Sequence, residues 1–173
     1  MRLRTDLRNH LGGILSSPRF KLFLGTTAGV LFLDQASKAV VSSTLKMHEI
    51  KPLVKGLINL TRLHNTGVAF GLLSGEVSTL RTLLFLSASL LAMGIVIWML
   101  LRLPPDRKVE QLALSLIFGG ALGNLLDRVR LGEVVDFIDI YYRNYHWPAF
   151  NVADSAISVG VTLLIWRLAF TEQ

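Results

Sequence analysis

Residues 83–101 read LLFLSASLLAMGIVIWMLL, nineteen positions without a charged side chain. A helix needs about 20 mostly apolar residues to cross a bilayer core, so this stretch predicts a membrane-spanning helix. The whole chain has a matching composition: of its 173 residues 51% are hydrophobic and 17% charged, and the mean hydropathy is +0.50. That composition excludes a disordered chain. The length predicts a single membrane-embedded domain over residues 1–173.

Three further apolar runs accompany this segment, at about 22–41, 111–128 and 154–170. Together the four runs predict an all-α integral membrane protein with four transmembrane helices. Basic residues precede the first run, which leaves a cleaved signal peptide as an alternative for it. Asp34 and Lys38 interrupt that run, and no clear small-residue cleavage site follows it, so a span is the preferred interpretation.

The distribution of Lys and Arg predicts the orientation of the helices. Nine of these residues lie in about 35 positions before the first span, between the second and third, and near the C-terminus. Eight lie in about 69 positions of the other two connections, 42–82 and 129–153 with their flanks. The denser side predicts that both termini are cytoplasmic and that these two connections are extracytoplasmic.

The first extracytoplasmic connection shows the pattern of a small β-sheet between the first and second helices. Apolar residues alternate imperfectly after Ile58, Lys55-Gly56 is a plausible turn, and Pro52 marks a break. The second connection contains Tyr141, Tyr142, Tyr145 and Trp147, which are typical of anchors at the headgroup level.

Several chemistries are excluded or disfavoured by composition. Cysteine is absent, and the four histidines are scattered without the spacing of a zinc-peptidase helix. The excess of basic residues on so hydrophobic a chain indicates membrane-flanking positions rather than nucleic-acid binding. We therefore expect no metal, no cofactor and no nucleic acid.

Ionisable groups at membrane depth are costly and are candidates for function. Asp34 and Lys38 lie four residues apart on one helical face, either as a structural pair or in a direct role. In the third span Gly120, Asn124 and Arg128 form one stripe beside Asp127, which predicts an interior polar groove. Interhelical hydrogen bonding is the simpler alternative, and the GxxxG spacing of Gly119 and Gly123 fits close helix packing.

Two acids are brought to the same leaflet by the predicted topology. Asp136 follows the third span and Asp154 begins the fourth, so the ends of two antiparallel helices place them together. Two close carboxylates share a proton, which suits peptide hydrolysis without a metal. The helix N-terminus favours ionised Asp154 as the base. The alternative is that Asp154 caps the helix and Asp136 is interfacial, while Asp34, Asp127 and Asp139 compete for the catalytic role.

Five blocks of this sequence resemble the lipoprotein signal peptidase family, the type II signal peptidases of bacteria. The resemblance covers residues 30–170 approximately, in the family's order and without departure at a motif position. The blocks are Asp34-Gln35-Ala36-Ser37-Lys38, Asn65-Thr66-Gly67-Val68-Ala69-Phe70, the ten residues 119–128 (GGALGNLLDR), Val134-Val135-Asp136-Phe137, and Phe150-Asn151-Val152-Ala153-Asp154.

The resemblance implies an intramembrane aspartic endopeptidase of the bacterial cytoplasmic (inner) membrane, with its active site near the outer leaflet. It would cut diacylglyceryl-modified prolipoproteins before the lipidated cysteine, contact membrane lipids and bind globomycin-type lipopeptide inhibitors. The catalytic aspartates would be Asp136 and Asp154. Substrate-binding positions would be Asn65, Gly120, Asn124, Arg128 and Asn151, and supporting positions would be Asp34, Lys38 and Asp127.

Two other classes of protein remain as alternatives. One is a non-enzymatic four-helix transporter subunit in which Asp34, Asp127, Asp136 and Asp154 form a proton relay. A relay needs acids at several depths, whereas a catalytic pair needs two at one depth. The other is a structural assembly factor, which gives no reason for so many acids at the membrane edge.

Overall fold

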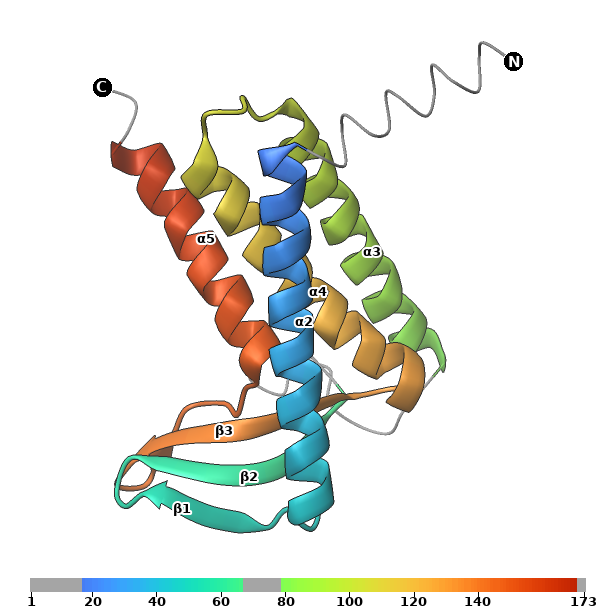
Figure 1. The fold of residues 1–173 in the computed structure, drawn as a ribbon. Helices are drawn as coiled ribbons and strands as arrows, with labels where there is room; N and C mark the ends of the chain where they lie inside the picture. The colour runs from blue at the N-terminus through green and yellow to red at the C-terminus, as the bar shows by residue number, and fades with distance from the viewer. Residues whose placement is uncertain (1–16, 67–78, 171–173) are drawn as a thin grey trace.

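The computed structural model describes residues 17–66 and 79–170, which fold into four helices and a small sheet at one end of them (Figure 1). The elements are α2 (Pro18–Thr44), β1 (Ile50–Val54), β2 (Ile58–Asn65), α3 (Thr79–Arg102), α4 (Lys108–Leu131), β3 (Val134–Tyr142), β4 (Tyr145–His146) and α5 (Val152–Phe170). Each of the four predicted spans lies within one of these helices, and the span predicted at 154–170 begins two residues after the start of α5.

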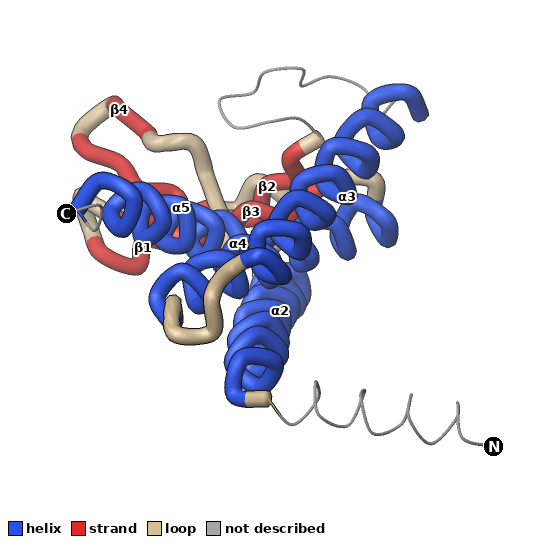
Figure 2. The backbone as a smooth tube through the Cα atoms, turned by 90° about the horizontal axis from the view of Figure 1, so that it is seen from above, coloured by secondary structure: helices blue, strands red, loops and turns tan. Residues whose placement is uncertain are grey.

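Helix α4 is the central helix and packs against the three others (Figure 2). Half of its apolar 18-residue stretch is buried, compared with 11% in α3 and 17% in α5. Its glycines allow this packing, because a Cβ added at Gly119 would lie 3.0 Å from Val30 Cβ, and one at Gly123 would lie 2.6 Å from Asp34 Oδ2. The close packing predicted from the GxxxG spacing is therefore confirmed.

Three of the described helices are long and apolar enough to cross a membrane: α4, α5 and the part of α3 from Thr82. Helix α2, although it has 27 residues, does not meet that criterion. It contains Asp34, Gln35 and Lys38 within its apolar run, and these residues lower its mean hydropathy.

The sheet is antiparallel with strand order β1-β2-β3-β4, and this order corrects the expectation that it lies wholly between the first two helices. Its third and fourth strands come from the connection after α4. β3 hydrogen-bonds along β2, with Asp136 opposite Leu63 and Val134 opposite Asn65. The apolar VVDFIDI run thus pairs with a strand about 75 residues earlier, and Tyr141, Tyr142 and Tyr145 lie on strands.

Two smaller expectations for the sheet can also be compared with the structure. The predicted turn at Lys55-Gly56 is confirmed, and Gly56 has a φ of +83°, a conformation that favours glycine. The break predicted at Pro52 is wrong, because Pro52 lies inside β1. β1 is an edge strand, where a residue without an N–H is tolerated, and the register shifts beside Pro52.

Helix contact through glycine gives a testable prediction. A Cβ at Gly160 of α5 would lie 2.6 Å from the backbone oxygen of Ala113, whereas one at Gly94 of α3 would have nothing within 4 Å. We expect Gly160→Ala to destabilise the protein by about 1–3 kcal/mol through overpacking. Thermal unfolding in detergent measures this loss. Gly94→Ala is the control and should unfold at or slightly above the wild-type temperature; an equal loss in both variants would contradict the packing argument.

Candidate active site

Asp136 and Asp154 line one cavity of about 830 Å³, which we call the aspartate cavity. Asp136 lies on β3 and is 3% exposed, while Asp154 lies in the first turn of α5 and is half-buried. The structure thus brings together the two acids that the topology predicted. The lining residues are Asn65, Phe85, Asn124, Arg128, Val134, Asp136, Ile140, Trp147, Pro148, Ala149, Phe150, Asp154, Ser155, Ile157, Ser158 and Val159.

Asn151 connects the two acids and is completely buried. Its side-chain Nδ2 donates to Asp136 Oδ1 at 2.7 Å. Its backbone N–H donates to Asp154 Oδ2 at 3.2 Å, and its Oδ1 accepts from the backbone N–H of Asp154 at 2.9 Å. This reciprocal pair is a capping box at the start of α5. The helix-cap interpretation of Asp154 is therefore correct, and it is compatible with a place in the cavity.

Asn124 of α4 joins this pair to a buried ionic cluster. Its Nδ2 donates to Asp154 Oδ1 at 2.8 Å, and its Oδ1 accepts from Lys38 Nζ at 3.2 Å. Lys38 also contacts Asp34 Oδ2 at 2.8 Å and Asp127 Oδ2 at 2.7 Å, with all three side chains at most 4% exposed. The predicted pairing of Asp34 with Lys38 is confirmed, and Asp127 is the third member of the cluster.

The ionic cluster also holds the surrounding backbone in place. Asp34 Oδ1 accepts from the backbone N–H of Ala153 in α5 at 3.0 Å. Asp127 Oδ2 accepts from the backbone N–H of Val135 in β3 at 3.3 Å. The residues that precede Asp154 and Asp136 along the chain are therefore both fixed by acids paired with Lys38. This arrangement fits the supporting role proposed for Asp34, Lys38 and Asp127.

Burial raises the pKa of Asp136 to about 7. Burial is the largest cause of this net pKa; the nearby charge of Asp154 also raises it, while hydrogen bonds from Asn65 and Asn151 and the charge of Lys38 lower it. Asn65 Nδ2 donates to Asp136 Oδ2 at 3.0 Å. Asp136 can therefore hold a proton near neutral pH, as a general acid must.

The remaining predicted site residues take different places. Arg128 lines the aspartate cavity, donates to the backbone oxygen of Asn124 at 3.4 Å and lies 5.3 Å from the centre of the Phe85 ring. Gly120 does not line the cavity and instead contacts Ala153, so a role in substrate binding remains only a prediction for it. Residues 67–70 of the second motif block lie outside the described residues.

Sequence reasoning missed several members of the site. Gln35 Nε2 donates to Asp127 Oδ1 at 2.9 Å and to Asp34 Oδ2 at 3.1 Å. The one sequence signal for Gln35 was its position in the first motif block. The apolar wall, which includes Phe85, Ile157 and Val159, had no signal beyond its place in or near the predicted spans. Among residues 17–66 and 79–170, no cluster of three His, Cys, Asp or Glu side chains could hold a metal ion.

The aspartates that a proton relay would use gather in one region of the described structure rather than along the length of the helices. Asp34 and Asp127 are paired with Lys38, and Asp136 and Asp154 meet at the cavity beside them. Asp139, which competed for the catalytic role, lies outside the aspartate cavity and pairs with His146 at 2.8 Å. A proton relay with acids at several depths is therefore not supported.

Comparisons with known proteins show the family to which the chain belongs. Residues 26–170 match the model of a family described as signal peptidase (SPase) II. The chain belongs to the signal peptidase II family. The lipoprotein signal peptidase of Geobacter sulfurreducens is 46% identical over 85% of this chain and 91% of its own length. That of Geobacter metallireducens is 47% identical over 90% of this chain and 95% of its own length.

Two solved structures of bacterial membrane enzymes have a similar fold. A bacterial membrane enzyme determined by the in meso method at 2.3 Å resolution has a TM-score of 0.77 and 32% sequence identity, covering 87% of this chain and 91% of that one. A second such structure, at 1.9 Å, has a TM-score of 0.73 and 31% identity. This signal peptidase II chain is accordingly an aspartic protease of a membrane-enzyme family.

The buried ionic cluster gives a prediction about stability. Lys38→Met leaves two buried carboxylates without their cation, so we expect a loss of about 3–5 kcal/mol, measured by unfolding in detergent. Asp34→Asn keeps the pair between Lys38 and Asp127 and should lose less. Lys51→Met is the control, because Lys51 contacts Glu49 at 3.5 Å on the surface and such pairs contribute about 0–1 kcal/mol. A Lys38 variant as stable as the Lys51 variant would contradict the assigned role.

Proposed function

We propose that this protein is an aspartic endopeptidase that removes signal peptides from prolipoproteins, cutting before a cysteine that carries a diacylglyceryl group. The observation that carries the proposal is the meeting of Asp136 and Asp154 on one cavity with an apolar wall. Part of that wall is exposed to the surroundings of the helices, since Val159 of α5 is 52% exposed. A lipid-modified substrate can therefore approach the acids from the membrane side.

The proposed chemistry needs one water molecule and the two carboxyl groups. Ionised Asp154 takes a proton from the water, whose oxygen attacks the scissile carbonyl carbon. Protonated Asp136 donates its proton to the carbonyl oxygen, which gives a neutral gem-diol. Return of one diol proton to Asp136, breakage of the C–N bond and protonation of the leaving nitrogen by Asp154 complete hydrolysis. The raised pKa of Asp136 favours this division of roles.

The polar residues of the aspartate cavity are suited to hold an extended peptide. A peptide cleaved at the edge of a membrane has no helical partners around the scissile bond, so its backbone groups need partners from the enzyme. We assign this role to Asn65 and Asn124, and assign Arg128 to a carbonyl of the peptide or lipid ester. Asn151 is completely buried and does not line the cavity, so substrate contact stays only a prediction for it. A cyclic lipopeptide such as globomycin would occupy the same cavity.

We infer that α2 is the fourth spanning helix. It buries Asp34 and Lys38 against α4 while exposing Phe32, Leu33 and Val40, which are 71%, 59% and 61% exposed. Its outward surface is therefore apolar, and its charged groups neutralise one another inside. Four spans place both termini on the same side, which the density of Lys and Arg assigns to the cytoplasm of a bacterial inner membrane. The sheet and the aspartate cavity then lie at the outer leaflet.

The catalytic assignment is tested with Asp136→Asn and Asp154→Asn. We expect either change to reduce kcat/KM by at least about 10²–10⁴-fold, the usual contribution of a general acid or base. The assay is a gel shift of a diacylglyceryl-modified prolipoprotein. Glu110→Gln is the control, since Glu110 is also buried but pairs with Arg167 near the far ends of α4 and α5. Wild-type cleavage by either aspartate variant would remove that residue from the mechanism.

The pH dependence of cleavage should reflect the proton on Asp136. Because the protonated form is active and its pKa is about 7, kcat/KM should fall about tenfold per pH unit above pH 7. The hydrogen bond from Asn65 lowers this pKa, so Asn65→Ala should move the alkaline midpoint to higher pH even while it slows cleavage. Asn59→Ala is the control: Asn59 lies on β2, as Asn65 does, but its amide binds Asp139 rather than Asp136. This variant should keep the wild-type midpoint. A midpoint that falls in Asn65→Ala would contradict the assignment.

A further inference from the structure

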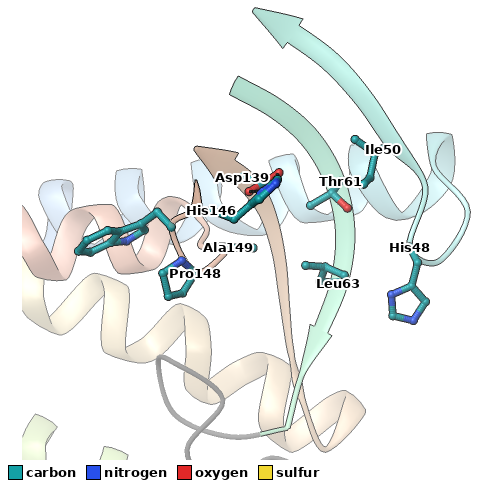
Figure 3. A pocket seen from close by; sticks show the side chains of 9 residues that line it. His48, Ile50, Thr61, Leu63, Asp139, His146, Pro148 and Ala149 are labelled. Carbon is teal, nitrogen blue, oxygen red and sulfur yellow. Dashed lines mark hydrogen bonds and ion pairs between the residues drawn. The ribbon is translucent and has the colours of Figure 1, made fainter. Parts of the chain in front are cut away.

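A second cavity, of about 740 Å³, has neither Asp136 nor Asp154 in its lining (Figure 3). We call it the histidine cavity. It is lined by His48, Ile50, Thr61, Leu63, Asp139, His146, Trp147, Pro148 and Ala149. These residues come from or adjoin all four strands, so the cavity extends across the sheet.

The lining of the histidine cavity combines fixed polar groups with an accessible aliphatic side chain. Asp139 accepts hydrogen bonds from Asn59 at 2.9 Å and contacts His146 at 2.8 Å, which holds the imidazole beside it. Thr61 lies on β2 and His48 in the turn before β1 (Figure 3), and Ile50 is 58% exposed. Five of the nine lining residues are apolar and four are polar, so the cavity can take apolar side chains and also bind the backbone groups of a polypeptide, which an acyl chain lacks.

The two cavities share one wall, since Trp147, Pro148 and Ala149 line both. This wall is attached to β3 at both ends. The N–H of Trp147 donates to the oxygen of Ile140 at 2.8 Å, and the N–H of Phe150 donates to the oxygen of Ile138 at 3.0 Å. Because the cavities lie on either side of this shared wall, a peptide leaving the aspartate cavity reaches the histidine cavity within a few residues.

The orientation of the bound substrate determines which part of it reaches the histidine cavity. Under the proposed function, the apolar signal peptide and the acyl chains stay at the membrane side, near Phe85, Ile157 and Val159. The chain after the lipidated cysteine must leave toward water, past the sheet. We propose that the histidine cavity binds the segment of the prolipoprotein that follows the lipidated cysteine. This inference rests on the proposed function and adds a second binding site to it.

The experiment compares two lipid-modified peptides, one ending as an amide at the lipidated cysteine and one continuing for six residues. For the wild type we expect kcat/KM to be about 5–10-fold higher for the longer peptide. Ile50→Trp, which fills the cavity, should lower this ratio to about one. Leu53→Trp is the matched control, because Leu53 lies on the same strand, is 69% exposed and does not line the cavity. It should keep the wild-type ratio.

Two results would overturn the inference while leaving the proposed function intact. One is a wild-type ratio of about one, and the other is a ratio unchanged in Ile50→Trp. Cleavage of neither peptide by the wild type would instead refute the proposed function and this inference together. Cleavage of the short peptide by Ile50→Trp shows that the variant is folded.

A crosslinking measurement on the wild type avoids dependence on any variant. A benzophenone side chain at the third residue after the cysteine should attach to the strands or connections that line the histidine cavity, as mapped by mass spectrometry. The same group placed on an acyl chain should not. Capture by the acyl-chain probe alone would assign the cavity to lipid and refute the inference.

Discussion

The site depends on the ionic interaction of the buried Lys38 ammonium group with two aspartates. This group lies within 2.8 Å of both Asp34 and Asp127, and those two acids in turn hold the backbone before Asp154 and Asp136. Lys38 is therefore paired with two acids that do not line the aspartate cavity. Asp136 receives its direct hydrogen bonds from amides, which donate protons but carry no charge. Burial and the neighbouring acid can therefore raise its pKa toward neutrality, which general acid catalysis requires.

Folding and the proposed chemistry use the same groups at the start of α5. Asn151 caps the helix with its side-chain oxygen while its amide nitrogen donates to Asp136. Asp154 completes the capping box and lines the cavity. A helix cap and a catalytic acid are often treated as competing interpretations of one residue. Here the cap fixes the carboxylate of Asp154 relative to Asp136, so the structural role supplies the geometry that the proposed reaction needs.

Much of this arrangement could be predicted from the sequence because the membrane restricts the topology. Apolar runs located the helices, and antiparallel neighbours placed the ends that carry Asp136 and Asp154 together. The pairing of β3 with β2 could not be predicted in this way. The VVDFIDI run has local backbone partners only in its second half, where it bonds to Trp147 and Phe150, and its register along β2 depends on a strand before α3. The hydrogen bonds of Gln35 and the contact of Gly120 with Ala153 likewise depend on the packing of separate helices.

The proposed fourth span, α2, illustrates how mean hydropathy can underestimate how well the surface of a helix suits a membrane. Mean hydropathy counts Asp34 and Lys38 as two charged residues wherever their side chains lie. In the structure both side chains face α4 and belong to one ionic cluster. What matters for a lipid-facing surface is the set of side chains that remain outside, and on α2 these include Phe32 and Leu33. A helix can thus be polar by composition and apolar by surface. The neutralisation that makes this possible comes partly from Asp127 on another helix, so it becomes visible only after the chain has folded.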